Sequence, residues 1–192
     1  MQNAGGRALT HLYIGIFLFF GAHFLPRASP LKGALVARLG TKGYRALFAL
    51  ISAIGLGLMI WGKVKAGHVS LYEPPHWGKS ATYILTIPAL VLLASAHMKG
   101  RIRKFARHPM LLGVLMWAVG HLLANGDLAS VWLFGSFALY SALAMILAGK
   151  ANAANNYTVK PAQDLMALGG GLGLALVLIL FAHQVLFGVK II

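Results

Sequence analysis

The chain contains no cysteine and only three acidic residues, Glu73, Asp127 and Asp164. The absence of cysteine excludes disulfides, iron–sulfur clusters and thiolate catalysis, because each requires a cysteine sulfur. A bound metal or haem would need histidine, methionine or carboxylate ligands. Proton relays through buried histidines usually include Asp or Glu, and the apolar segments of this chain lack both at their centres. The chemistry open to the chain therefore depends on its eight histidines.

Charged residues make up only 10% of the 192 residues, whereas apolar residues make up 59% and the mean hydropathy is +0.76. A soluble domain usually carries about 25% charged residues. The chain has too little polar surface to coat a water-soluble globule, so the hydrophobic effect indicates lipid as its solvent.

Six apolar runs lie at residues 9–25, 47–64, 81–97, 109–124, 129–148 and 165–189. A bilayer core is spanned by about 20 helical residues. In lipid each run must be helical, because a helix satisfies its own backbone hydrogen bonds. We predict an all-α, polytopic membrane helix bundle of about six transmembrane helices, forming one domain over residues 1–192.

The net charge of +14 would suggest nucleic-acid binding in a soluble protein. Here the basic residues lie between the apolar runs, so topology and anionic lipid headgroups explain them, and we expect membrane lipids and no nucleic acid as partners. The cations concentrate in the first, third and fifth loops, at residues 27–45, 99–107 and 150–160. The positive-inside rule places these loops in the cytoplasm and both termini in the periplasm, for a protein of the bacterial inner membrane.

Four histidines lie within apolar runs, where an ionisable side chain is costly and usually functional: His11, His23, His121 and His183. Zinc usually requires three or four ligands. Two intramembrane histidines on different helices, without cysteine, instead favour haem b. His11 and His23 are 12 residues apart, about 18 Å along a helix, so they cannot bind one metal together.

Gly113, Trp117, His121 and Asn125 recur every four residues, which predicts one stripe with an aromatic ring, a nitrogen ligand and an amide. The alternative is that His121 hydrogen-bonds a neighbouring helix and Trp117 only packs. Gly15, Phe19 and His23 predict a similar stripe on the first helix, where the small Gly15 would leave room for a planar group; core packing is the alternative. At the ends of the run 109–124, Pro109 suits the first helical position, and Asn125-Gly126-Asp127 predicts a capping turn.

The sequence resembles the NnrU family of bacterial membrane proteins over nearly its whole length. Three stretches carry the likeness. The first is Phe20-Gly21-Ala22-His23 with Leu39-Gly40-x-x-x-Tyr44-Arg45-x-Leu47-Phe48-x-Leu50, and the second is Trp77 after two prolines. The third and most specific begins with Arg107-His108-Pro109-Met110-Leu111-Leu112-Gly113, continues through Trp117 and His121-Leu122-Leu123-Ala124-Asn125-Gly126-Asp127, and ends with Leu133-Phe134-Gly135. The resemblance implies a link to denitrification and nitric oxide metabolism.

A related likeness, to 15-cis-zeta-carotene isomerase, implies a haem b whose ligands match His23 and His121. Trp117, Asn125, Arg107 and His108 are the further residues that we expect to contact a cofactor. The isomerase has a cysteine where this chain has Ala118, so a role for that thiol does not transfer. Depth in the membrane separates His23 from His121 by about 15 Å at 1.5 Å per residue. His11 and His183 therefore remain rival ligands.

The Arg107-His108-Pro109 motif also resembles isoprenylcysteine and phospholipid methyltransferases, which use it near S-adenosylmethionine. Those enzymes have a downstream acidic pair, whereas here only Asp164 follows the run 129–148. Three interpretations stay open: a haem b protein, a membrane isomerase or methyltransferase acting on a hydrophobic small molecule, and a non-catalytic assembly factor.

Overall fold

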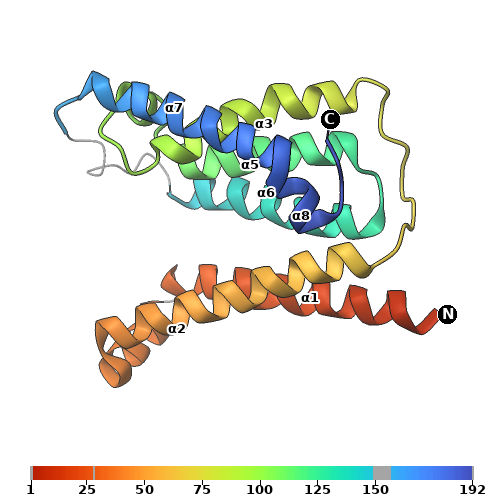
Figure 1. Cartoon of the computed structure of the whole chain (residues 1–192). Helices are drawn as coiled ribbons and strands as arrows, with labels where there is room; N and C mark the ends of the chain where they lie inside the picture. The colour runs from red at the N-terminus through yellow and green to blue at the C-terminus, as the bar shows by residue number, and fades with distance from the viewer. Residues whose placement is uncertain (1, 28, 149–156, 192) are drawn as a thin grey trace. The chain divides into compact units, whose positions relative to one another are not determined.

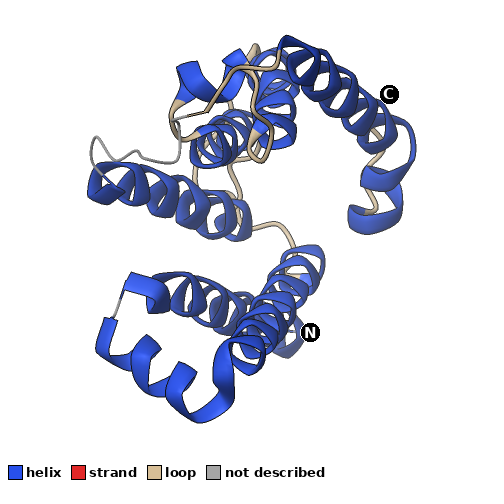
Figure 2. Ribbon diagram, turned by 90° about the vertical axis from the view of Figure 1, so that its left-hand side faces the viewer, coloured by secondary structure: helices blue, strands red, loops and turns tan. Residues whose placement is uncertain are grey.

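The computed structural model describes residues 2–27, 29–148 and 157–191, and within them the chain is helical without any strand (Figure 2). This confirms the predicted all-α class. The chain divides into two compact units, residues 1–69 and 70–192. We call them the N-terminal and the C-terminal unit and describe each by itself. The single domain over residues 1–192 stays a prediction.

Among the described residues, four helices are long and apolar enough to cross a membrane: Pro30–Lys65, Gly78–Ser95, Leu128–Ala148 and Pro161–Phe187. Pro109–Ala124 is a shorter apolar helix. Gln2–Phe24 has 23 residues, about 34 Å at 1.5 Å per residue, which matches a hydrocarbon core of roughly 30 Å. These helices confirm that the chain is a membrane protein with a helix bundle.

The N-terminal unit consists of α1 (Gln2–Phe24), the short 3-10 helix η1 (Leu25–Arg27) and α2 (Ser29–Lys65), with α1 and α2 packed along each other (Figure 1). The contact depends on glycines that let the two backbones approach closely. A Cβ on Gly62 would lie 2.6 Å from the Leu12 nitrogen, and one on Gly15 would lie 2.6 Å from the Gly55 oxygen. Leu12 and Met59, in the same contact, are fully buried.

The basic segment that we expected to be a loop, residues 27–45, is instead largely helical. Hydropathy detects apolar surface and not backbone conformation, so it does not predict a helix in this basic segment. The helix is interrupted at Gly40, whose φ of 69° and ψ of 168° divide α2 into a first arm (29–39) and a second arm (41–65). Only glycine adopts such a conformation at little cost.

The C-terminal unit contains α3 (Gly78–Ser95), α4 (Arg101–Ala106), α5 (Pro109–Ala124), α6 (Leu128–Ala148) and α7 (Pro161–Val177). A π-helical turn, η3 (Leu178–Ala182), then joins α7 to α8 (His183–Phe187). α5 packs on both α3 and α6, and α7 packs on α3 (Figure 1). Gly171 of α7 makes a close approach to α3, since its Cβ would lie 2.5 Å from the Val91 Cα.

Asp127 caps α6 and confirms the predicted capping turn. Its carboxylate accepts hydrogen bonds from the Ser130 amide at 3.0 Å and the Ser130 hydroxyl at 2.6 Å. Gly126 accepts the Leu71 amide at 2.8 Å, and Tyr72 donates its hydroxyl to the carbonyls of Leu122 and Asn125. Burial, and then the Asp127 carboxylate, raise the pKa of Tyr72 above its usual value. The 70–77 loop is thus fastened to the end of α5.

At the other end of this unit, Asp164 holds the start of α4. Its carboxylate accepts the backbone amides of Arg101 at 2.9 Å and Ile102 at 3.0 Å. Gln163 beside it accepts the Lys99 amide. The basic third loop is therefore ordered by the first turn of α7. In the fifth loop, residues 149–156, which include Lys150, lie outside the described residues.

Candidate functional site

His121 lies in the last turn of α5, and one contact with the backbone shows which of its ring nitrogens carries a proton. Nδ1 is 2.8 Å from the carbonyl oxygen of Trp117. A carbonyl only accepts, so Nδ1 must carry the proton and Nε2 must carry the lone pair. Histidines that bind metals commonly donate the second ring N–H to a carbonyl in this way, which fixes both tautomer and orientation. In its neutral form, His121 can therefore act as a nitrogen donor through Nε2.

Aromatic rings surround this imidazole. Phe134 of α6 stacks on it, with ring centroids 4.6 Å apart and planes at 30°, and Trp117 lies at 5.0 Å. Phe134 and Phe137 meet Trp117 edge-on, at 5.1 and 5.3 Å. Phe134 is buried, with 7% of its surface exposed. The imidazole thus lies in an aromatic environment built by α5 and α6.

Three of the four residues that the sequence assigned to this stripe lie together in the structure: Trp117, His121 and Asn125. Gly113 does not lie with them. Asn125 donates its side-chain amide to the His121 carbonyl at 2.8 Å, one turn after the contact of His121 with Trp117. Gly113 instead faces α3, where its Cβ would lie 2.8 Å from the Ala89 oxygen. Four residues turn a helix by about 400°, so a four-residue spacing drifts about 40° per step. The expected stripe therefore turns around α5, so that Gly113 faces α3 and His121 faces α6.

His183, one of the rival ligands, lies in the same unit as His121. It follows the π-helical turn, and π-helical turns within α-helices are often found at functional sites. Its Nδ1 lies 3.1 Å from the Val189 carbonyl, which gives it the same tautomer as His121. His121 and His183 thus belong to the same compact unit and have the same tautomer.

His23 lies in the N-terminal unit, at the end of α1. Its Nδ1 is 2.7 Å from the Phe19 carbonyl, so its lone pair is also on Nε2. Phe19 stacks on the ring with centroids 4.2 Å apart, and Phe48 lies at 5.1 Å. The space that we expected Gly15 to leave for a planar group is filled by the α2 backbone, so Gly15 serves core packing. His11 has the same tautomer, with Nδ1 2.5 Å from the Arg7 carbonyl.

Arg107 and His108 lie at the start of α5, so the structure does not bring them to His121. Thirteen residues separate the two histidines, about 20 Å along a helix. Arg107 has φ 57° and ψ −50°, and the His108 amide bonds back to the Ala106 carbonyl at 2.5 Å. This is a γ-turn, a strained conformation for a residue with a side chain. Pro109 follows at the first helical position, as predicted.

Within the described ranges, no three residues of the types His, Cys, Asp and Glu gather closely enough to bind a metal ion. A closed zinc site needs three or four such ligands. Haem iron takes four nitrogens from its own macrocycle and one or two ligands from the protein. One or two histidines are therefore enough for haem iron but not for a closed zinc site.

Phe134 and Phe137 are the residues of this site that sequence reasoning did not assign. The signal was available in part, because both lie on the next apolar run and three residues apart, which places them on one helix face. What the sequence does not give is the pairing of that face with the His121 face of α5. That pairing depends on how α5 and α6 pack.

Two comparisons, one with curated proteins and one with solved structures, gave no match. The sequence matches the model described as NnrU protein over residues 11–191. The match covers nearly the whole chain, and it includes His121 of α5 and residues of both compact units. This chain is therefore a member of the NnrU family of membrane proteins.

Proposed function

We propose that this NnrU-family protein binds haem b, with His121 as an axial ligand of the iron. The observation that carries the proposal is the hydrogen bond from Nδ1 of His121 to the Trp117 carbonyl, which orients the ring and leaves the lone pair on Nε2. The stacked Phe134 restricts the rotation of this imidazole. Haem b would supply one-electron transfer or the binding of a small diatomic ligand.

The second axial ligand has two candidates. The family resemblance nominates His23, whose ring has the same tautomer and lies between aromatic neighbours. Its location in the same compact unit as His121, with the same tautomer, nominates His183. Either histidine would supply the second protein ligand, and the proposed link to nitric oxide metabolism rests on the resemblance alone.

The residues of the chain have separate tasks in this proposal. The Trp117 carbonyl accepts the Nδ1 proton of His121, so in the neutral ring the lone pair is on Nε2. Asn125 donates to the carbonyl of His121 and, together with the Tyr72 hydroxyl, fastens the end of α5. Phe134 stacks on the imidazole, and Phe134 and Phe137 pack edge-on against Trp117.

The test is the absorption spectrum of the full-length protein, purified in detergent after expression with ample haem. We expect a Soret band that is strongly weakened in His121→Ala and unchanged in His76→Ala, whose histidine lies exposed in the 70–77 loop. His23→Ala and His183→Ala then identify the second ligand by a shift in the same band. A colourless wild-type protein would refute the proposal.

The proposed placement in the bacterial inner membrane follows from the charge distribution, with the basic loops in the cytoplasm and both termini in the periplasm. Cysteines introduced singly at Ser70 and Thr158 test this orientation, because the natural chain has no cysteine. In intact cells, a membrane-impermeant maleimide should label a cysteine at position 70 and not one at 158. The opposite labelling would reverse the proposed topology.

A further inference from the structure

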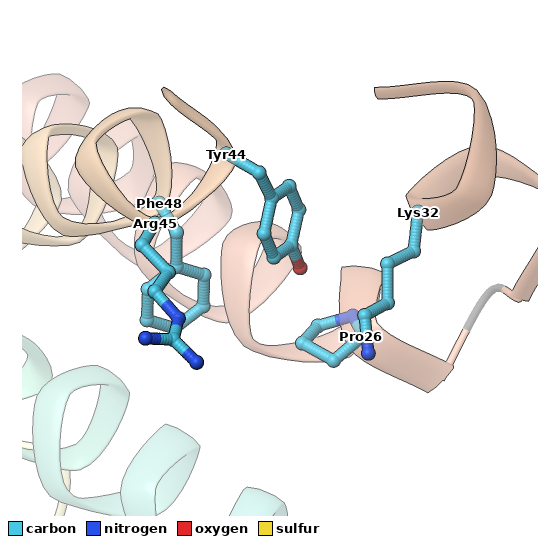
Figure 3. A pocket seen from close by; sticks show the side chains of 5 residues that line it. All are labelled: Pro26, Lys32, Tyr44, Arg45 and Phe48. Carbon is cyan, nitrogen blue, oxygen red and sulfur yellow. The ribbon is translucent and has the colours of Figure 1, made fainter. Parts of the chain in front are cut away.

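A small pocket lies in the N-terminal unit, whereas His121 belongs to the C-terminal unit. Its volume is about 190 Å³, and it is lined by Pro26, Lys32, Tyr44, Arg45 and Phe48 (Figure 3). One water needs roughly 10–15 Å³, whereas pockets for drug-sized ligands measure about 300–1,000 Å³. The pocket thus suits a polar headgroup and is too small for a macrocycle or a whole lipid.

Three segments build this pocket, and the break at Gly40 is what lets them meet. Pro26 belongs to η1 and Lys32 to the first arm of α2. The second arm, after the break, contributes Tyr44, Arg45 and Phe48. In Figure 3 the Tyr44 ring lies between Arg45 and Phe48 on one side and Lys32 and Pro26 on the other. An uninterrupted helix would carry Lys32 about 18 Å from Tyr44 along its axis.

The polar groups of the pocket are complementary to an anion. Lys32 and Arg45 bring two positive charges, and residues 1–69 contain eight Lys or Arg and no Asp or Glu, so the unit holds no carboxylate to neutralise them. Tyr44 is 8% exposed, and its hydroxyl is buried without a hydrogen-bond partner among the described residues. A buried hydroxyl without a partner costs about 1–3 kcal/mol, and each instance in a native protein requires an explanation.

The position of the pocket along the chain indicates where the anion comes from. Pro26 follows the first apolar run, which ends at residue 25, and Phe48 lies at the start of the second, which begins at residue 47. The pocket therefore lies where both helices leave the hydrocarbon core, at the depth of the lipid headgroups. Arginine binds phosphate oxygens through its planar fork, and lysine adds a point charge.

We propose that this pocket binds the phosphate group of an anionic phospholipid, held by Arg45 and Lys32 with the Tyr44 hydroxyl as a further donor. Phe48 and Pro26 form the apolar wall beside the glycerol end of the headgroup. Free inorganic phosphate shares the same chemistry but lacks the acyl chains that keep a lipid at this depth. The proposal does not rest on haem binding.

The experiment is a titration of the full-length protein in detergent with phosphatidylglycerol, followed by native mass spectrometry. We expect phosphatidylglycerol to bind more tightly than phosphatidylcholine, and millimolar inorganic phosphate not to displace it. Arg45→Gln and Lys32→Gln should each weaken binding about tenfold, the effect of losing one charge-assisted hydrogen bond. Arg45→Lys keeps the charge without the fork and should weaken binding less than Arg45→Gln.

Arg38→Gln is the matched control, because Arg38 is an exposed cation on the first arm of α2 that does not line the pocket. It should change the affinity less than twofold. Tyr44→Phe removes a single oxygen from the pocket and should weaken binding by a few fold while the helix content by circular dichroism stays unchanged. Equal losses for Arg38→Gln and Arg45→Gln, equal binding of phosphatidylcholine, or displacement of the lipid by inorganic phosphate would each overturn the proposal.

Discussion

Replacing Gly62 by alanine tests the close packing of α1 against α2. The added Cβ would lie 2.6 Å from the Leu12 nitrogen and 2.8 Å from the Ala8 oxygen. Both are backbone atoms, so no side chain can rotate away and the helices must separate. Separation opens the contact around Leu12 and Met59, which are both fully buried. Overpacking of this kind costs about 1–3 kcal/mol.

The control is Gly57→Ala on the same helix, because no atom of the described residues lies within 4 Å of a Cβ at that position. Alanine exceeds glycine in helix propensity by up to about 1 kcal/mol, so this change should leave stability unaltered or raise it. One kcal/mol shifts Tm by about 2–4 °C for a chain of 150–250 residues. We expect Gly62→Ala to lower Tm by about 2–12 °C.

Tm is measured for the two variants and the wild type in the same detergent, from the intrinsic tryptophan fluorescence. Trp61 lies next to Gly62 in sequence and contacts His11 edge-on, with ring centroids 4.4 Å apart, so separation of the helices should also alter its emission. Equal Tm values for Gly62→Ala and Gly57→Ala would show that α1 and α2 do not pack as closely at Gly62 as the structure indicates.

Three further predictions concern the C-terminal unit. Asp127→Ala removes the cap of α6 and both contacts to Ser130, so it should destabilise the protein by about 0.5–2 kcal/mol, read as a fall in Tm. Arg107→Gly relieves a strained backbone, so Tm should stay level or rise by a few degrees, since such strain costs about 1–3 kcal/mol. The raised pKa of Tyr72 means that its neutral, donating form is favoured in the folded state. Its contribution is therefore present below the unfolded pKa of about 10 and is lost as pH rises through the higher folded pKa.

Each of these predictions has a result that contradicts it. An unchanged Tm for Asp127→Ala would mean that the cap contributes nothing to stability. A fall in Tm for Arg107→Gly would show that the γ-turn is not strained. For Tyr72 the measurement is Tm between pH 8 and 11, where the wild type should lose more stability above pH 10 than Tyr72→Phe. Parallel curves of Tm against pH for the two proteins would show that Tyr72 makes no pH-dependent contribution to stability.

Much of the fold follows from hydropathy because a bilayer forces apolar segments into helices. The run 109–124 coincides with α5, and the run 129–148 differs from α6 by one residue at its start. The helical arm at residues 29–39 was missed, since a basic segment has no apolar run to reveal it. The break at Gly40 was also missed, because a glycine in the sequence does not show which φ it adopts.

The candidate site was predictable to a lesser degree. Residue type and depth identified His121, and helical spacing placed Trp117 and Asn125 beside it, as the structure shows. The same spacing wrongly kept Gly113 on that face, because the drift of about 40° per four residues accumulates. Phe134 became part of the site only through the packing of α6 on α5, which a single sequence does not encode in a readable form.

The absorption spectrum of purified wild-type protein, recorded beside that of His121→Ala, is the decisive test of haem binding by His121. We expect a Soret band in the wild type, a strongly weakened band in His121→Ala, and a wild-type band in the loop variant His76→Ala. A wild-type protein that is colourless after expression with ample haem, or a His121→Ala spectrum identical to the wild type, would contradict the proposal that His121 binds haem.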